Sequence, residues 1–298
     1  MPTNPLQLVG TVIAALLGLA FGSFLNVVLT RYPEGESLAT PRSHCRNCDH
    51  TLSWWENIPI LSWIILRSRC RNCQTRIGLR YPLVELTIAI FWTAIWLKFS
   101  PPLFSDLTTA LPTEPLTATI LKLAGQALLC WLLAALAILD AEYFWLPDWF
   151  TLSGVVLGIL SKVLIARAST SGHHPFDWLG EAWPAFVEAL APAAIVLVIR
   201  LAYWLVRRKE GMGLGDAKLM AMLGAWLGLI GALECFAIAI LGATAAALVW
   251  LVILVTRRQA SQWRSMPLPL GTFLCIAALS EVFYPDWPWT LWTQHFPL

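Results

Sequence analysis

Two aspartates, Asp140 and Asp216, have the residue type and the position to do chemistry at a membrane. Each adjoins a long apolar run, and Asp216 follows three alternating glycines, Gly211, Gly213 and Gly215. A carboxylate inside a membrane segment costs about 3 kcal/mol or more, so its presence indicates a functional site. Two acids a few ångströms apart cannot both ionise, which prepares one as a base and the other as an acid. We therefore predict that Asp140 and Asp216 are the catalytic pair of an aspartyl protease.

The neighbouring acids have simpler explanations. Asp148 follows Pro147 where a helix should begin, so we expect it to cap free backbone amides. Glu142 is expected to be a solvated charge at the membrane interface. Asp216 could itself cap the next helix, but the glycines before it would let another backbone, such as an opened substrate strand, approach closely. The order G-x-G-x-G-D, with no strand before it, does not fit a nucleotide-binding loop.

Two cysteine pairs lie in the polar, arginine-rich segment 31–80. Each pair has the sequence Cys-Arg-Asn-Cys, and 21 residues separate the pairs, just beyond the range of about 15–20 residues that is usual in zinc ribbons. Four thiolates at this spacing can close a tetrahedron around Zn²⁺, which would hold together a segment with few apolar side chains. The predicted ligands are Cys45, Cys48, Cys70 and Cys73. The alternatives are two disulfides, two redox pairs, or a ligand set in which His44 or His50 replaces a cysteine.

The rest of the chain indicates an all-α polytopic integral membrane protein. It is 58% hydrophobic and only 13% charged, against about 25% charged in soluble domains. Runs of about 18 apolar residues can cross the hydrocarbon core, and only helices satisfy their own backbone there. We expect about eight transmembrane helices, at residues 6–29, 83–98, 119–139, 150–166, 186–206, 217–229, 232–255 and 268–283.

The basic residues predict the orientation of these helices. Most of the 20 Lys and Arg residues fall in the segments 31–80, 207–218 and 256–267, which should therefore face the cytoplasm. Both termini then lie outside, and both aspartates lie at the cytoplasmic face. The first helix has no basic residues before it, so it is expected to be a retained anchor. The net charge of +2 is explained by this topology and gives no reason to expect a nucleic-acid partner.

The order of these features resembles the prepilin peptidases, also called type IV leader peptidases. The resemblance runs through most of the chain. It rests on the two cysteine pairs, on the two aspartate segments, and on residues 21–28, 31–33, 55–59 and 80–85. Residues 266–273 are a looser version of the family's proline-phenylalanine-glycine segment.

The resemblance implies both an activity and a set of site residues. The family's catalytic aspartates fall on Asp140 and Asp216, and its zinc-site cysteines on the four cysteines named above. Such an enzyme cleaves the leader of type IV prepilins or type II secretion pseudopilins on the cytoplasmic side, after a glycine. It then methylates the new N-terminus with S-adenosyl-L-methionine. The partners would be these substrates and the lipid bilayer of the bacterial inner membrane.

We therefore expect three parts: a first transmembrane helix (1–30), a cytoplasmic zinc-binding loop with four cysteine ligands (31–80), and a helical membrane domain with the protease site (81–298). The runner-up interpretation is a transporter or channel in which Asp140 and Asp216 form an ion or proton site. Ser23 and Asn26 are expected to serve helix packing. Glu85 is expected either to pair with Arg80 or to bind a substrate charge.

Overall fold

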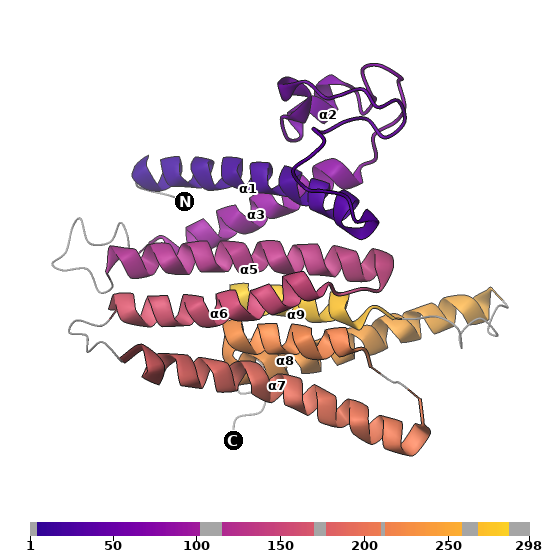
Figure 1. The fold of residues 1–298 in the computed structure, drawn as a ribbon. Helices are drawn as coiled ribbons and strands as arrows, with labels where there is room; N and C mark the ends of the chain where they lie inside the picture. Colours follow the sequence, from indigo (N-terminus) through magenta and orange to yellow (C-terminus); the bar gives the residue numbers. More distant parts are fainter. Residues whose placement is uncertain (1–4, 102–114, 170–176, 210–211, 258–267, 286–298) are drawn as a thin grey trace. The chain divides into compact units, whose positions relative to one another are not determined.

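The computed structural model describes the whole chain except residues 1–4, 102–114, 170–176, 210–211, 258–267 and 286–298 (Figure 1). It divides into two compact units, Met1–Trp131 and Leu132–Leu298. The described residues contain helices and turns but no strand longer than an isolated bridge. The prediction of an all-α protein is confirmed.

The first unit contains two complete long helices, the cysteine segment between them and the N-terminal part of a third long helix, α5 (Leu116–Tyr143). Helix α1 (Pro5–Arg31) packs against α3 (Arg80–Phe99). The contact is close because Gly18 and Gly22 lie against the backbone of α3, where an added Cβ would come within 2.6 Å of a Cα atom. Small residues four apart allow such an approach between membrane helices. The intervening segment contains the short helices η1 (Tyr32–Glu34), η2 (Trp54–Asn57) and α2 (Leu61–Ile65).

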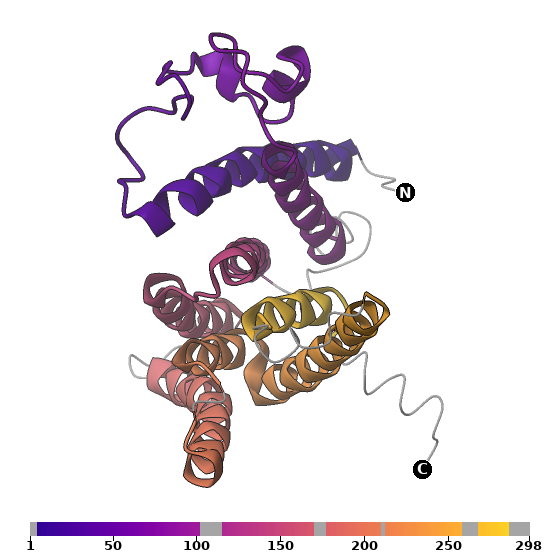
Figure 2. The ribbon, with the colours of Figure 1, turned by 90° about the vertical axis from the view of Figure 1, so that its right-hand side faces the viewer.

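Helix α8 is the centre of the second unit. The unit contains the C-terminal part of α5 (Leu116–Tyr143) together with α6 (Asp148–Ser169), α7 (Asp177–Arg207), α8 (Leu214–Thr256) and α9 (Leu270–Phe283). Helix α8 contacts α6, α7 and α9. Figure 2 shows it beside α7 on one side and α9 on the other. Nearly every residue from Ala217 to Trp226 is buried, as expected for a helix that is apolar all round.

The sixth and seventh predicted helices are the two halves of α8. The chain leaves the helical conformation at Gly228, with φ 81° and ψ 174°, values that glycine adopts without steric cost. The first half packs on α6, where Met222 and Trp226 lie against Gly154 and Gly158. Unbroken, the 43 residues of α8 would extend for about 65 Å, roughly twice the hydrocarbon thickness.

The helices fit a polytopic membrane protein. Six of them, α1, α3, α5, α6, α7 and α8, are long and apolar enough to cross a membrane, and α9 is a shorter apolar helix. With α8 divided at Gly228, the predicted apolar ranges fall within helices, apart from the end of the sixth range, which runs to residue 229, and the first two residues of the last range. The apolar runs placed the elements correctly, and the predicted division of α8 lies close to the point where its backbone breaks.

Candidate active site and metal centre

The predicted catalytic aspartates lie at two helix ends that the second unit brings together. Asp140 is in the last turn of α5 and Asp216 is in the first turn of α8. Leu146, in the turn between α5 and α6, contacts both Gly215 of α8 and Gly271 of α9. The C-terminal end of α5 and the N-terminal ends of α6, α8 and α9 therefore meet around one turn (Figure 1). The two carboxyl groups are close enough to interact electrostatically.

Asp140 is held by the start of α9. Its residue is only 6% exposed, and its Oδ2 atom accepts a hydrogen bond from the backbone N–H of Thr272 at 2.7 Å. The Thr272 hydroxyl lies 3.1 Å from the same oxygen and also 3.1 Å from the carbonyl oxygen of Ala137. A carboxylate at a helix N-terminus is favoured by the free amides and by the helix dipole. Thr272 thus fixes one oxygen of Asp140.

Asp216 is half-buried and is held by its own helix. Its Oδ2 atom accepts a hydrogen bond from the backbone N–H of Gly213 at 3.1 Å. Gly213 is the residue before the helix, so Asp216 is not the helix cap itself but lies three residues inside. From there its side chain reaches back to a free amide, as in half of a capping box. The carboxyl group is thereby fixed at the start of α8, the end that meets α5.

The glycines near the aspartates are explained by close packing. A Cβ atom at Gly271 would lie 3.0 Å from Cγ of Asp140, and one at Gly215 would lie 3.1 Å from Cβ of Leu146. Side chains at these positions would push the helix ends apart and move the carboxyl groups. Gly213 precedes α8 in an extended conformation, and Gly211 lies outside the described residues. The prediction that bare backbone here receives a substrate strand stays a prediction.

Three contacts near the aspartates were not foreseen from the sequence. The first is Thr272, although residues 266–273 had been singled out by their resemblance to the family. The second is an ion pair between Lys218 Nζ and Asp148 Oδ1 at 2.5 Å, which links the starts of α6 and α8. Asp148 was expected to cap its helix, and this is the one side-chain bond that the structure describes for it. The third is the hydrogen bond from Arg200 to the carbonyl oxygen of Met212 at 2.9 Å.

The two cysteine pairs fold into two matching knuckles. In the first, the N–H of Asp49 donates to the carbonyl of Cys45, and the N–H of Cys45 donates to the carbonyl of His50. In the second, Gln74 and Cys70 repeat the pattern with Thr75. Asp49 and Gln74, each directly after the second cysteine of its pair, both have left-handed φ angles, 54° and 59°. The repeated sequence therefore builds a repeated turn that points two sulfurs the same way.

The four thiols lie together and fit a tetrahedral metal. Their Sγ atoms are all within 4.8 Å of one another, with Cys45 and Cys73 at 3.7 Å and Cys48 and Cys70 at 4.0 Å. A tetrahedron with Zn–S bonds of about 2.3 Å has sulfurs about 3.8 Å apart. None of the four is in a disulfide. The donor set and its spacing fit Zn²⁺ in a structural, four-ligand site.

The thiols differ in how readily they lose a proton. Hydrogen bonds with Thr75 lower the pKa of Cys73 to about 5, while burial raises the pKa of Cys45 to about 11. A metal ion binds the thiolate, so binding here releases protons and weakens as the pH falls. His50 lies 3.7 Å from Glu56 and the ring of His44 contacts the carbonyl of Arg42. Neither belongs to the cluster of metal-ligand atoms.

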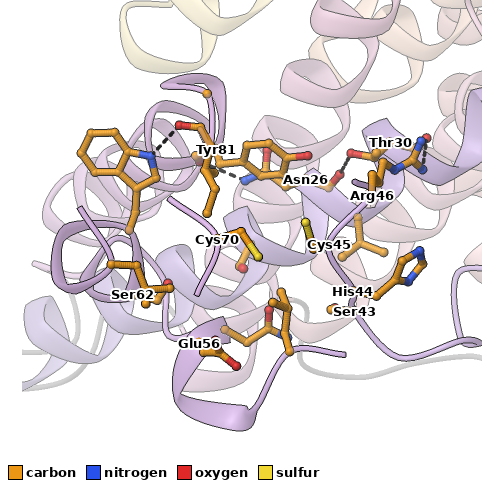
Figure 3. A pocket seen from close by; sticks show the side chains of 18 of the residues that line it. Asn26, Thr30, Ser43, His44, Cys45, Arg46, Glu56, Ser62, Cys70 and Tyr81 are labelled. Carbon is orange, nitrogen blue, oxygen red and sulfur yellow. Dashed lines mark hydrogen bonds between the residues drawn. The ribbon is translucent and has the colours of Figure 1, made fainter. Parts of the chain in front are cut away.

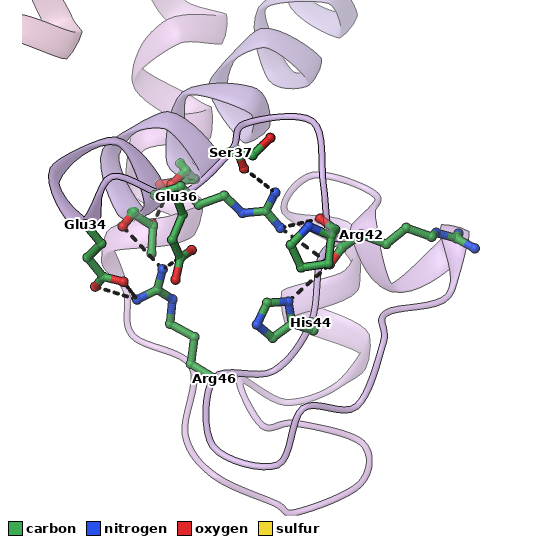
Figure 4. A network of polar contacts seen from close by, with 10 residues as sticks. Glu34, Glu36, Ser37, Arg42, His44 and Arg46 are labelled. Atoms are coloured by element: carbon green, nitrogen blue, oxygen red, sulfur yellow. Dashed lines mark hydrogen bonds and ion pairs between the residues drawn. The ribbon is translucent and has the colours of Figure 1, made fainter.

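Two arginines fasten the first knuckle to the end of α1 (Figure 4). Arg31, buried at the end of the helix, donates to the carbonyl oxygens of Ser37 and Pro41 at 3.1 and 2.8 Å. Arg46, between the cysteines of the first pair, donates to both carboxylate oxygens of Glu34 at 2.6 and 2.7 Å. Both of these bonds come from Nη1 of Arg46, and Nη2 donates to the carbonyl oxygen of Thr30 at 3.3 Å, so the guanidinium group is held by charge-assisted hydrogen bonds at the end of α1. The metal loop is therefore tied to its helix and does not hang free.

Asn26 and Glu85 both tie elements of the first unit together. Asn26 donates to the carbonyl oxygen of Tyr81 at 2.9 Å, which agrees with the predicted packing role. Glu85 accepts a hydrogen bond from the backbone N–H of Ile60 at 2.7 Å, and Ser23 and Asn26 also interact with its carboxyl group. Both residues are buried: Asn26 is 5% exposed and Glu85 is 7% exposed.

The fold and these two sites define a class: a polytopic helical membrane enzyme with paired carboxyl groups at its helix ends and a loop whose four cysteines could hold a metal ion. Residues 16–99 match the Bacterial Peptidase A24 N-terminal domain, and residues 127–252 match the Type IV leader peptidase family. The chain belongs to the type IV leader peptidase family and is a membrane peptidase. The first match contains the metal loop, and the second contains both aspartates.

Individual relatives agree with this assignment. The chain is 33% identical over 296 residues to a prepilin leader peptidase/N-methyltransferase of Aeromonas salmonicida, covering 91% of this chain and 89% of the relative. It is 35% identical over 239 residues to a type 4 prepilin-like proteins leader peptide-processing enzyme of Escherichia coli, covering 73% and 77%. No solved structure matches the chain. Membership of a peptidase family favours the protease over a transporter or channel.

Proposed function

We propose that this protein removes the leader peptide of prepilins or pseudopilins and methylates the new N-terminus, with Asp140 and Asp216 as the catalytic pair. The observation that carries the proposal is the meeting of two carboxyl groups, 76 positions apart in the sequence, at neighbouring helix ends. Relatives are named for both activities. Without such a pair, membership of the family would not by itself explain how the protein could cleave a peptide bond.

The proposed cleavage uses the two carboxyl groups in different roles. One carboxylate takes a proton from water while the other, protonated, donates a hydrogen bond to the scissile carbonyl. The water oxygen bonds to the carbonyl carbon, the C–N bond then breaks, and the departing amine takes up a proton. Thr272 holds Oδ2 of Asp140, which fixes the direction in which the remaining oxygen faces. Orientation of this kind lowers the barrier because the groups need no further ordering.

The proposed location of the site follows from charge. Segments 207–218 and 256–267 carry clustered basic residues and lead into α8 and α9. By the positive-inside rule, we propose that both helix starts, and with them Asp216 and Thr272, lie at the cytoplasmic face of the bacterial inner membrane. Both termini would then be outside. A leader that remains in the cytoplasm while the pilin helix crosses the membrane would present its cleavage point at this boundary.

The methylation step requires a bound methyl donor. S-adenosyl-L-methionine supplies an electrophilic methyl group on a cationic sulfur, and its transfer to the new amine leaves a neutral thioether and releases a proton. The four cysteines would hold Zn²⁺ away from this chemistry, because four protein ligands leave no position open for a reacting group. The metal would stabilise the loop of residues 31–80.

The decisive experiment incubates the purified protein with a prepilin and analyses the product by mass spectrometry. We expect a shortened chain with a new N-terminus, and an added methyl group only when S-adenosyl-L-methionine is present. A protein that is folded and zinc-loaded but leaves the prepilin intact would refute the proposed function. Shortened product without methyl in the presence of the donor would refute the methylation alone.

A further inference from the structure

We infer that a cavity in the first unit binds the methyl donor, an inference that rests on the proposed methyltransferase function. The cavity measures about 430 Å³ and lies between the C-terminal half of α1, the start of α3 and the two cysteine knuckles (Figure 3). Its volume falls in the range of about 300–1,000 Å³ that small-molecule sites occupy. All of its lining residues lie between Ser23 and Glu85, within the part that matches the A24 N-terminal domain.

The buried polar groups of the cavity fit a cationic nucleoside. Glu85 brings a carboxyl group to the wall formed by α1 and α3, with Ser23 and Asn26 beside it. A carboxylate can accept hydrogen bonds from ribose hydroxyls, as it does in dinucleotide sites, and it also attracts a sulfonium or ammonium cation. Burial strengthens both interactions because the local dielectric constant is low. We assign Glu85 to the donor's ribose and positive charge.

A second carboxyl group closes the opposite wall. Glu56 lines the cavity, its side chain is fully buried, and its Oε1 atom has no hydrogen-bond partner in the described structure. Its Oε2 atom accepts from the N–H of Ser53 at 2.7 Å. Burial opposes its charge, but the bonds from Ser53 and the nearby charges of His50 and Arg71 outweigh burial and hold the pKa of Glu56 below its usual value. The cavity therefore has a carboxyl group on each side, Glu85 on one and Glu56 on the other.

The remaining walls of the cavity offer a flat ring for the base and positive charge for the carboxylate of S-adenosyl-L-methionine. Trp63 lines the cavity, and its indole N–H donates to the carbonyl of Ile77 at 3.2 Å. That bond fixes the ring, which offers a flat apolar face for a base. Arg71 and Arg76 also line the cavity and can meet the carboxylate of a methionine moiety. A cavity with buried acids, a fixed indole and nearby guanidinium groups matches all three parts of S-adenosyl-L-methionine.

The metal loop forms part of the cavity wall. Cys45 and Cys70, one from each knuckle, line it, and in the view of Figure 3 they lie between Asn26 and Tyr81 on one side and Glu56 on the other. A metal ion bound to both pairs would therefore fix two walls of the cavity at once. The structural metal would thereby support methyl transfer, because it would hold the walls of the donor site in place.

The test measures binding of S-adenosylhomocysteine to the purified full-length protein by isothermal titration calorimetry. Glu85→Gln keeps the shape and removes the charge, and Trp63→Ala removes the ring. Each should weaken binding by about tenfold or more, the size expected when a buried hydrogen bond to a charged group or a stacking surface is lost. The matched controls are Glu142→Gln and Trp54→Ala, which alter exposed side chains outside the cavity. They should bind as the native protein does.

Zinc content and leader cleavage are measured on the same samples, so that a misfolded variant is recognised. Weakened binding in both cavity variants, with zinc retained, supports the assignment. Native affinity in folded Glu85→Gln and Trp63→Ala overturns it, even if the native enzyme methylates its product. Failure of the native enzyme to methylate would count against the proposed function, and the binding measurement would still decide on the cavity.

Discussion

The cysteine cluster and the aspartate pair differ in how far apart in the sequence their contacting residues lie. The sulfurs that meet in the cluster are 22 and 28 residues apart, and each knuckle is closed by hydrogen bonds over five residues. At the aspartate pair, the bond that holds Asp140 reaches across 132 residues to Thr272. One site is therefore made by local turns and the other by the packing of whole helices. A substitution in the cysteine cluster should accordingly affect only the loop around it, whereas one at the aspartate pair should affect several helices.

The largest expected effect is at the aspartate pair. Asp140→Asn and Asp216→Asn should each lower leader cleavage by about a thousandfold or more, and the double variant should be little worse, because members of one catalytic unit are not additive. Asparagine keeps the shape and removes the ionisable proton. The measurement is single-turnover cleavage of a prepilin by protein reconstituted in lipid.

The matched control for these variants is Glu142→Gln, which alters an exposed acid two residues from Asp140. It should cleave at close to the native rate. Substantial cleavage by either single aspartate variant would end the assignment of a catalytic pair. Equal loss in Glu142→Gln would indicate a general electrostatic effect instead.

The next effect is on the metal loop. Cys45→Ser or Cys70→Ser should reduce bound zinc from one per chain to nearly none and loosen residues 31–80, because each removes one of four ligands. Cleavage should fall less than in the aspartate variants, since a disturbance of the knuckles stays local. Elemental analysis and limited proteolysis measure the two effects.

Cys130→Ser is the control, because that thiol is buried in α5 and far in sequence from the cluster. It should keep its zinc. If the native protein held no metal and its four loop thiols reacted freely, the metal centre would be disproved while the aspartate pair stood.

A smaller effect tests the long-range bond. Thr272→Val keeps the backbone N–H and the side-chain volume but removes the hydroxyl that lies 3.1 Å from Asp140. Loss of one hydrogen bond to a charged group costs about 1.5–3 kcal/mol, so kcat should fall about tenfold or more. KM should change little, because the described contacts of this hydroxyl are with Asp140 and with the carbonyl oxygen of Ala137.

Thr272→Ser should restore most of the rate, since serine keeps the hydroxyl. A change in the pH profile of kcat in Thr272→Val, absent in Thr272→Ser, would show that the bond acts through Asp140. Equal, pH-independent losses in both variants would instead assign Thr272 a packing role.

The smallest effect is expected at Asp148. Its ion pair with Lys218 is partly solvated, with side-chain exposures of 63% and 33%, and such pairs contribute about 0–1 kcal/mol. Asp148→Asn should therefore keep cleavage within about threefold of native. A loss as large as that of Asp216→Asn would make Asp148 a member of the catalytic group and break the assignment of the pair.

The same difference in range explains what the sequence could predict. The spacing of Cys45, Cys48, Cys70 and Cys73 predicted that the four thiols would lie together, because short turns leave them little freedom. The apolar runs predicted the helices and a division of α8 close to Gly228, because runs of apolar residues and glycines are local properties of the sequence. Thr272 could not be identified as the partner of Asp140, since nothing local to either residue shows which helix ends meet. The cavity beside Glu85 was equally hidden, because it arises from packing between α1, α3 and the loop.

The bond between Thr272 and Asp140 has a consequence for how the enzyme comes into being. Helix α9 is the last described helix, so a ribosome has already made both aspartates long before it makes the residue that orients one of them. We expect a nascent chain to remain inactive until α9 has entered the bilayer. A chain that stops at Thr256 would contain the whole pair and should leave a prepilin uncut. Cleavage activity would thus indicate that insertion is complete, and an incomplete chain could not cleave other membrane proteins around it.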